Sequence, residues 1–364
     1  MHFVKMHGAE NDYIFVNNFL DRAEDPASLA REMSERHRGI GSDGLILLLP
    51  SRCADARMRI FNPDGSEAEM CGNGARCAAK LLHDDDLVRG KEVTLETLSG
   101  IRRVRLLFDI SEESVFYGAL RTVTGAEVEM GVPVIGHEAA SAADHPNAKG
   151  GRFCGSEGNG GSDGAGNGNG NGNGNRFARG RIPPPGWAGE PNLDVDSVEV
   201  GGRRLDGLCV SVGNPHFVIF VDDVLGFSLS RIAPRIETLP IFPNRTNVEF
   251  VQICNDGSLL ARVWERGTGE TRACGTGAVA SVAAAMARGM LKRDQTVTVR
   301  LTGGNLTVRW DGRGPAWLAG EAVEVYRGNW LRRQRVRESE SDILPYLGRR
   351  TPKAMPQGNG RLRS

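Results

Sequence analysis

The sequence reads FNPDGSEAEMCGNGARCAAK at residues 61–80 and VWERGTGETRACGTGAVASV at residues 263–282. Each stretch leads from an expected strand through an acidic, glycine-containing turn to Cys-Gly-X-Gly, which opens an expected helix. The two cysteines, Cys71 and Cys274, lie 203 residues apart. Such self-similarity predicts two copies of one structural unit. If the copies face each other, their Cys-Gly turns meet across the cleft between them.

Short β-branched and aromatic runs in both halves of the chain predict mostly strands. They lie at residues 13–16, 45–49, 57–61, 92–95, 217–221, 248–253, 259–264 and 296–301. One helix is predicted in each half, from 74 to about 82 and from 277 to 288, with Gly289 as the stop. The second helix is apolar on every side, which predicts that a curved sheet surrounds it.

Composition limits the organisation and the partners of the protein. The 364 residues suffice for about two domains, and Lys plus Arg and Asp plus Glu both number 45. Because the formal net charge is zero, we expect neither nucleic acid nor a membrane surface as a partner. The tract at 155–175 is almost entirely Gly, Asn, Ser and Asp, and the segment 334–364 is charged and rich in Pro and Gly, so both are predicted to be disordered. We predict domains at 1–130 and 195–320, with an insertion at 136–187.

The cysteines and the N-terminal residues bear on the cellular compartment in which the protein is expected. Seven cysteines, at 53, 71, 77, 154, 209, 254 and 274, are an odd and scattered set, unlike a secreted disulfide framework. No apolar run reaches the roughly 18 residues of a membrane span, and the first residues lack a leader pattern. We therefore expect a soluble cytoplasmic protein.

Paired cysteines at helix N-termini suit acid–base chemistry at carbon. The helix dipole and free N–H groups favour the thiolate and are expected to lower the thiol pKa, while the following glycines let a carboxylate approach the backbone. Inverting an α-carbon requires removing a proton from one face and returning one to the other, which two opposed thiols can do. The charge that develops would be stabilised at the two helix N-termini, without a cofactor or metal.

Other readings of the cysteines remain open. Cys53, Cys77, Cys209 and Cys254 are best read as small buried hydrophobic residues, and Cys154 as an incidental exposed thiol. Cys71 and Cys274 could instead form a structural disulfide. A zinc site is disfavoured because the spacing from Cys71 to Cys77 is not that of a zinc pair.

Six motifs occur in an order that resembles the diaminopimelate epimerase family, an enzyme family of lysine and cell-wall precursor synthesis. They are KMHGAENDYIFV (5–16), RGIGSDGLILL (38–48), IFNPDGSEAEMCGNGARC (60–77), VGNPHFV (212–218), FPNRTNVEFV (242–251) and VWERGTGETRACGTGA (263–278). The resemblance implies an α/β (α+β) fold of two pseudo-symmetric domains, each a mixed, barrel-like sheet around a central helix. It implies that residues 321–329 return to the N-terminal domain, and that the protein is a homodimer. The implied reaction is the cofactor-independent interconversion of LL- and meso-2,6-diaminopimelate.

The same resemblance assigns roles to residues. Cys71 and Cys274 are the implied acid–base thiols, with His216 and Glu265 as helpers. The implied substrate-binding residues are Asn11, Asn62, Gly72, Asn73, Asn214, Asn247, Glu265, Arg266, Gly275 and Thr276, of which Gly72, Asn73, Gly275 and Thr276 would hold the α-carboxylate. One position departs from the pattern: Gly44 stands where many members of the family have a Gln that contacts substrate.

Two alternative functions differ in class. A proline racemase or hydroxyproline epimerase would use the same fold and two thiols, but proline lacks the distal amino-carboxylate that Asn62, Asn214, Asn247 and Arg266 would bind. A non-catalytic binding protein on this fold could instead use the Gly/Asn-rich tract as its working part. Retention of both cysteines together with His216 and Glu265 favours the enzyme.

Overall fold

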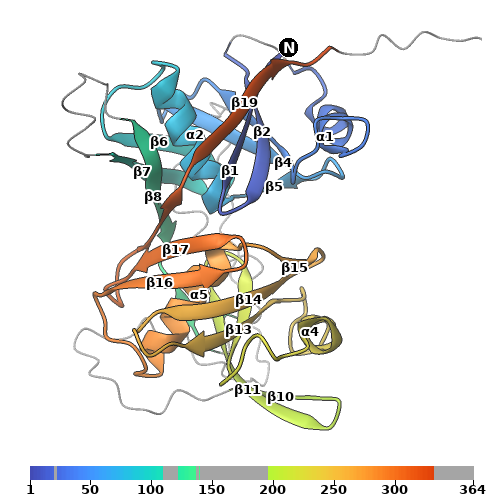
Figure 1. Ribbon diagram of the computed structural model, residues 1–364, viewed down its shortest axis with the longest axis vertical. Coiled ribbons are helices and arrows are strands. Elements are labelled where there is room, and N and C mark those ends of the chain that lie inside the picture. Colours follow the sequence, from blue (N-terminus) through green and yellow to red (C-terminus); the bar gives the residue numbers. More distant parts are fainter. Residues whose placement is uncertain (20–22, 110–121, 137–138, 140–195, 332–364) are drawn as a thin grey trace, which may run out of the picture. The chain divides into compact units, whose positions relative to one another are not determined.

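The computed structural model describes residues 1–19, 23–109, 122–136, 139 and 196–331. The predicted Gly/Asn-rich tract, the predicted tail and nearly all of the predicted insertion lie outside these residues. His2–Asn329 form one compact unit, to which Met1 and Trp330 do not belong. The unit His2–Asn329 consists of two halves (Figure 1).

The N-terminal half begins with a hairpin and ends with a strand that leads out of it. Its elements are β1 (His2–Gly8), β2 (Asn11–Asn17), α1 (Pro26–Ser34), β3 (Leu45–Leu49), β4 (Ala56–Phe61), β5 (Glu67–Ala68), α2 (Gly72–Asp84), β6 (Glu92–Thr97), β7 (Gly100–Phe108) and β8 (Val123–Gly131).

The C-terminal half repeats this order. Its elements are β9 (Val134–Ile135), β10 (Asp196–Val200), β11 (Arg203–Ser211), β12 (Pro215–Phe220), α4 (Leu229–Glu237), β13 (Asn247–Ile253), β14 (Leu259–Glu265), β15 (Gly269–Thr271), α5 (Gly275–Ala287), β16 (Thr296–Leu301), β17 (Gly304–Arg309) and β18 (Ala316–Glu321), followed by β19 (Val323–Asn329).

The two halves share one strand register. In the first half β2 and β3 pair in parallel with Phe15 opposite Ile46, and in the second β12 and β13 pair in parallel with Val218 opposite Glu249. Both members of the second pair lie 203 residues beyond those of the first, the same offset that separates Cys71 from Cys274. The predicted internal repeat is therefore present in the backbone as well as in the motifs.

Three pairings join segments that are far apart in the sequence. β18 pairs antiparallel with β8 of the N-terminal half and also with β17 of its own half. β19 then pairs antiparallel with β1, placing His2 opposite Asn329. β9 pairs with β11, so the chain enters the second half directly after leaving β8. Residues 323–329 thus lie on the N-terminal sheet, although the predicted domain boundaries themselves stay predictions.

Each half wraps its strands around one helix (Figure 1). Every residue of α5 from Gly277 to Ala287 is buried, and α2 is buried from Gly72 to Leu82. An Ala-rich helix without a polar face satisfies its own backbone hydrogen bonds and presents only apolar groups to the strands around it. The fold is thus a mixed α+β one dominated by sheet, as expected, and the prediction of a fully buried second helix is confirmed.

The predicted strands are also found, within one or two residues at each end. Two helices, α1 and α4, were not predicted. Among the described residues, no helix is both long and apolar enough to cross a membrane.

Candidate active site

A cavity of about 950 Å³ is lined by residues of both halves. Eleven of the thirteen predicted site residues line it: Asn11, Asn62, Cys71, Gly72, Asn73, Asn214, Glu265, Arg266, Cys274, Gly275 and Thr276. His216 and Asn247 do not line the cavity, and both are buried. The fold therefore gathers residues from distant motifs into one space, with both thiols on its wall.

Each thiol caps the helix that follows it. Cys71 is the N-cap of α2, and its Sγ accepts a hydrogen bond from the Gly74 N–H at 3.3 Å. Cys274 is the N-cap of α5, and its Sγ accepts from the Gly277 N–H at 3.4 Å. Both sulfur atoms consequently lie at the positive end of a helix dipole.

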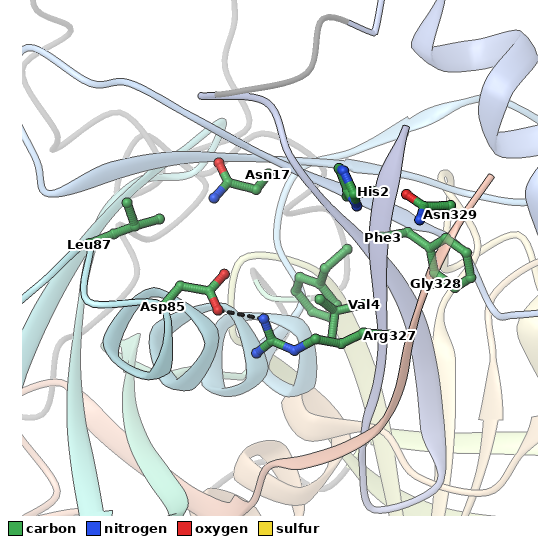
Figure 2. A pocket seen from close by; sticks show the side chains of 10 residues that line it. His2, Phe3, Val4, Asn17, Asp85, Leu87, Arg327, Gly328 and Asn329 are labelled. Atoms are coloured by element: carbon green, nitrogen blue, oxygen red, sulfur yellow. Dashed lines mark hydrogen bonds and ion pairs between the residues drawn. The ribbon is translucent and has the colours of Figure 1, made fainter. Parts of the chain in front are cut away.

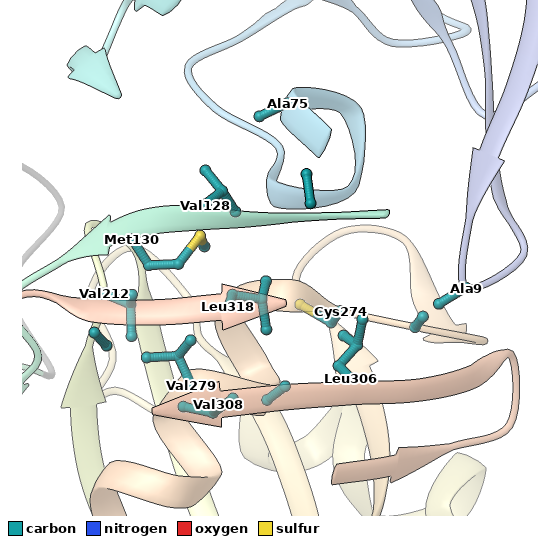
Figure 3. Close-up of a cluster of buried hydrophobic side chains, with 14 of the residues drawn as sticks. Ala9, Ala75, Val128, Met130, Val212, Cys274, Val279, Leu306, Val308 and Leu318 are labelled. Carbon is teal, nitrogen blue, oxygen red and sulfur yellow. The ribbon is translucent and has the colours of Figure 1, made fainter. Parts of the chain in front are cut away.

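The two Cys-Gly turns meet at a single leucine side chain. A methyl group added at Gly275 would lie 3.9 Å from the Cα of Gly72 and 2.8 Å from Cδ2 of Leu318. A methyl group added at Gly72 would lie 3.0 Å from the same Leu318 atom. In Figure 3, Leu318 on β18 lies beside Cys274. A larger residue at either position would therefore displace the Leu318 side chain, which lies between the two helix ends.

Two amides and a phenol surround Cys71. Asn11 Nδ2 donates to Asp43 at 2.9 Å, which turns its Oδ1 toward the thiol and the Asn73 amide. The Cys71 sulfur lies 3.6 Å from that oxygen. Burial raises the pKa of Cys71, whereas hydrogen bonds from the Tyr13 hydroxyl and the Gly74 N–H lower it.

A chain of hydrogen bonds leads away from Cys274. Its Sγ lies 3.4 Å from Thr276 Oγ1, which accepts from Asn214 Nδ2 at 3.3 Å. Asn214 Oδ1 lies 3.0 Å from His216 Nε2, and His216 Nδ1 lies 2.6 Å from a carboxylate oxygen of Glu249. Thus His216 reaches the thiol only through Asn214 and Thr276.

Burial and two carboxylates act on Cys274. Burial raises its pKa well above the ordinary value, and Glu265 and Glu249 raise it further. The expected net lowering of the thiol pKa is therefore wrong for both cysteines, since burial outweighs the helix N–H groups that do lower it. A thiolate with a raised pKa is a stronger base, which suits a weakly acidic α-proton.

Glu265 is a cavity residue that acts on both thiols. Its carboxylate accepts a short hydrogen bond from the Thr271 hydroxyl. Burial raises the pKa of Glu265, and its negative charge in turn raises the pKa values of Cys71 and Cys274. Its location agrees with the predicted role as a helper near the thiols, which stays a prediction.

The residues predicted to bind the distal end of a substrate differ in exposure and in the hydrogen bonds that they already make. Arg266 is exposed and donates through Nη1 to the Asn244 carbonyl oxygen at 3.0 Å, and Asn62 donates to the Ser66 hydroxyl at 2.9 Å. Asn247 donates to the Pro215 carbonyl oxygen at 2.8 Å and accepts from the Arg266 N–H at 2.9 Å. In this structure Asn247 therefore braces the backbone of its neighbours.

Most of the chain is similar in sequence to proteins of one known family. A model of the diaminopimelate epimerase family matches residues 3–123 and 208–329. The diaminopimelate epimerase of Moorella thermoacetica is 41% identical over 332 residues, covering 91% of this chain and 99% of that one. The chain belongs to the diaminopimelate epimerase family. The diaminopimelate epimerase of Desulfovibrio desulfuricans is 39% identical over 335 residues, covering 91% and 98% of the two chains.

Solved structures of lower identity share the fold. A phenazine biosynthesis protein of the PhzF family from Bacillus anthracis has a TM-score of 0.57 at 17% identity, covering 91% of this chain and 99% of that one. A probable proline racemase from Agrobacterium radiobacter has a TM-score of 0.56 at 15% identity, covering 91% and 93%. The two-half architecture of the diaminopimelate epimerase family thus extends beyond the family itself.

Gly44 is the position expected from the resemblance to depart from the family pattern. A Cβ at this position would lie 2.5 Å from the Phe61 carbonyl oxygen and 3.0 Å from Cε1 of Tyr13. A Gln side chain would therefore not fit without a backbone shift, because the Phe61 carbonyl oxygen and the Tyr13 ring already fill the space beside Gly44.

Sequence reasoning missed four residues of the site. Tyr13 hydrogen-bonds Cys71, Glu249 pairs with His216, Arg76 holds Asn73, and Arg102 lines the cavity. The offset of 203 residues could have revealed the first two: it relates Tyr13 to His216 and Ile46 to Glu249. Comparing the halves residue by residue would have marked both pairs as differences inside an otherwise repeated motif.

A second cavity, of about 560 Å³, lies against β1, β2 and β19. Its apolar wall includes Phe3, Val4 and Phe15, and an ion pair of 2.6 Å between Asp85 and Arg327 lies at its side (Figure 2). Neither thiol lines it, so the chemistry belongs to the larger cavity.

Proposed function

We propose that this protein is a cofactor-independent diaminopimelate epimerase, an isomerase that interconverts LL- and meso-2,6-diaminopimelate. The observation that carries the proposal is the pair of helix-capping thiols on the wall of one cavity. Membership of the diaminopimelate epimerase family supports the substrate, because relatives at about 40% identity over nearly their full length bear that name.

In the proposed reaction the two thiols exchange roles with the direction of turnover. One thiolate takes the α-proton, and the electron pair of the broken C–H bond stays on the α-carbon and its carboxylate. The opposed thiol then delivers its own proton to the other face of the carbon. One sulfur therefore gains a proton and the other loses one, and no redox change occurs.

The helix N-termini would hold the reacting end of the substrate. The backbone N–H groups at the starts of α2 and α5 lie next to the two thiols, and Gly72 and Gly275 line the same cavity, so we propose that these N–H groups bind the α-carboxylate. Negative charge that develops during proton removal would be stabilised there by donors that are already oriented. We propose Asn73 and Thr276 as side-chain partners of the same carboxylate.

The distal amino-carboxylate would be read by polar groups farther along the cavity. The guanidinium of Arg266 can bind a carboxylate with two parallel hydrogen bonds, and the Asn62 and Asn214 amides can serve both an ammonium and a carboxylate. Asn247 and Glu265 complete the proposed set. Asn247 would act indirectly, by accepting a hydrogen bond from the Arg266 N–H.

The test is exchange of the α-proton. The purified protein is incubated with LL-diaminopimelate in deuterated water under reductant, and deuterium entry and meso product are followed by NMR and chiral chromatography. We expect both to occur, and both to be lost in Cys71→Ala and Cys274→Ala. Exchange with proline but not with diaminopimelate would replace the proposal by a proline racemase, and no exchange with either would favour a binding protein.

We also propose that the protein acts in the cytoplasm as a homodimer. Support comes from the family resemblance and from the scattered, odd set of cysteines. Sedimentation at several concentrations tests the dimer, and a mass that stays at one chain throughout would contradict it.

A further inference from the structure

The two half-sites have matching backbones but differ in their charged residues. The offset of 203 residues relates Ile46 to Glu249 and Asn62 to Glu265, so two neutral residues near Cys71 correspond to two carboxylates near Cys274. The same offset relates Arg76 in α2 to Val279 in α5. Symmetry of the fold therefore does not extend to the electrostatics of the two thiols.

On the Cys274 side the charge lies directly beneath the helix opening. The side chain of Glu249 is fully buried, and a methyl group added at Gly277 would lie 2.8 Å from its Oε1 and 3.4 Å from the Cys274 sulfur. Its Oε2 has no hydrogen-bond partner among the described residues. Glycine at 277 thus makes room for a carboxylate, whereas at the equivalent Gly74 the nearest atom is Cδ1 of Ile46, at 2.6 Å.

The charged groups that face Cys274 come from three strands. Glu249 lies on β13, Glu265 on β14, and His216 on β12, where it is bound to Glu249. Thr276, in the first turn of α5, contributes a hydroxyl. His216 offsets part of the Glu249 charge, yet it is held on the far side of Asn214 and Thr276, so the carboxylates dominate at the sulfur.

On the Cys71 side a buried cation is added. Arg76 is fully buried in α2; it donates to Asn73 Oδ1 at 2.9 Å and to the Glu321 carbonyl oxygen at 3.3 Å. Its Nη1 has no partner among the described residues. A guanidinium does not lose its proton in proteins, so its positive charge acts on Cys71 at all relevant pH. Tyr13 on β2 adds a donor, and Glu265 on β14 opposes them.

We propose that the free enzyme holds the proton of its thiol pair on Cys274 and the negative charge on Cys71, and that Glu249 is the positioning residue that sets this preference. The inference rests on the proposed two-thiol function. The inference adds a direction to that function. A turnover that begins with Cys71 as the base leaves a proton on Cys71 and none on Cys274. Solvent must then return a proton to Cys274 and remove one from Cys71 before the resting form is restored.

Alkylation of the intact, substrate-free protein tests the proposal. Short pulses of iodoacetamide at a series of pH values are followed by digestion and mass spectrometry of the Cys71 and Cys274 peptides. The pH at which each rate reaches half its maximum reports thiolate formation and does not depend on how accessible the sulfur is. We expect the midpoint of Cys71 to lie below that of Cys274.

Glu249→Gln is the decisive variant, because it keeps an acceptor for His216 and removes only the charge. We expect the Cys274 midpoint to fall toward that of Cys71, changing the ratio of the two rates at neutral pH by about tenfold for each unit of movement. Glu237→Gln is the matched control, since Glu237 is a buried carboxylate bound to Trp264 and Gly267 outside the cavity. We expect it to leave both midpoints in place.

Two results would overturn the proposal: a Cys274 midpoint at or below that of Cys71 in the unaltered protein, or equal midpoint shifts in Glu249→Gln and Glu237→Gln. Should Glu249→Gln fail to fold, Arg76→Met tests the other half-site, where the Cys71 midpoint must rise. Alkylation needs no turnover, so a failure of the proposed function would appear separately, as absence of α-proton exchange with the midpoints unchanged.

Discussion

Tyr13 and His216 occupy equivalent places, one in each half, but they reach their cysteines differently. The Tyr13 hydroxyl bonds the Cys71 sulfur directly, whereas His216 acts through Asn214 and Thr276. Burial and the neighbouring Cys71 hold the pKa of Tyr13 well above its usual range, so the hydroxyl keeps its proton and remains a donor. At the residue scale the site is therefore asymmetric around a symmetric backbone.

Replacing Tyr13 with Phe should shift the pH profile of the enzyme. The hydroxyl lowers the pKa of Cys71, so its loss raises that pKa and moves the rising limb of kcat/KM to higher pH. Since a hydrogen bond to a charged group contributes about 1.5–3 kcal/mol, we expect activity near neutral pH to fall by roughly tenfold and to recover in alkali. Initial rates measured across pH test this. A rising limb of kcat/KM at the same pH as in the unaltered protein would show that Tyr13 does not act on Cys71.

Cys77 offers a contrast within the same helix. Burial raises its pKa to about 12, and the side chain is almost fully buried. We expect native alkylation at mildly alkaline pH to spare Cys77 while Cys71 reacts, because only the thiolate is nucleophilic. Peptide mapping decides between them, and comparable labelling of both would contradict the buried, structural role of Cys77.

Residue identities at this site were readable from sequence where they stood inside a repeated motif. Cys71 and Cys274 were found from the repeat, but Glu249 was not, because it lies outside the Cys-Gly motif and only the alignment of the two halves marks it. Its contact with Gly277 arises from two elements that are adjacent only in the folded chain. Likewise, the burial that raises both thiol pKa values arises only when the two halves fold together around the cavity.

At the scale of elements, α5 shows how firmly a helix opening can be constrained. A methyl group at Gly277 would meet Glu249, and one at Gly275 would meet Leu318. The two glycines therefore leave space for the Glu249 carboxylate and for the Leu318 side chain.

Gly277→Ala should be harmful despite the higher helix propensity of Ala. The added Cβ would lie 2.8 Å from Glu249 Oε1, and relieving that contact displaces the carboxylate or the first turn of the helix. We expect a loss of about 1–3 kcal/mol in unfolding free energy, as for other overpacked sites, and a larger loss of activity. Chemical denaturation and turnover measure both. Gly289→Ala, at the exposed end of the helix, serves as a comparison in which stability falls without a specific loss of catalysis.

The strands and buried helices were predicted from periodicity and composition, but α1 and α4 were not. Each has nine residues, and each contains a proline, Pro26 at the start of α1 and Pro234 within α4. Asp25 caps α1 by accepting from the Ser28 N–H, so a start signal was present. In α4 the interior proline contradicts local preference, and packing against the sheet outweighs it.

At the scale of the whole molecule, the path of the chain joins the halves. β18 pairs with β8, and the next strand, β19, pairs with β1 at the other end of the sequence. The symmetry predicted that the Cys-Gly turns meet, but the connection through β18 and its Leu318 could not be predicted from the motifs. Leu318 is an ordinary strand residue, and only long-range pairing reveals its location.

The meeting of the two turns leads us to expect a disulfide between the halves under oxidation. Cys71 and Cys274 are free here, and the glycines that follow them are in close approach. Mild oxidant should abolish activity and form one Cys71–Cys274 bond, with recovery in reductant. Non-reducing peptide mapping identifies the bond. Inactivation without this linkage would mean that the sulfur atoms are held too far apart.

The offset of 203 residues that relates the two half-sites has a consequence for how they can differ. Two separate copies of one gene product facing each other would carry every substitution on both sides of the cavity at once. Joined in one polypeptide, each copy can mutate alone, so Tyr13 could come to stand opposite His216, and Ile46 opposite Glu249. The two sides of the cavity can therefore carry different residues on one shared backbone, which two copies of a single chain could not do.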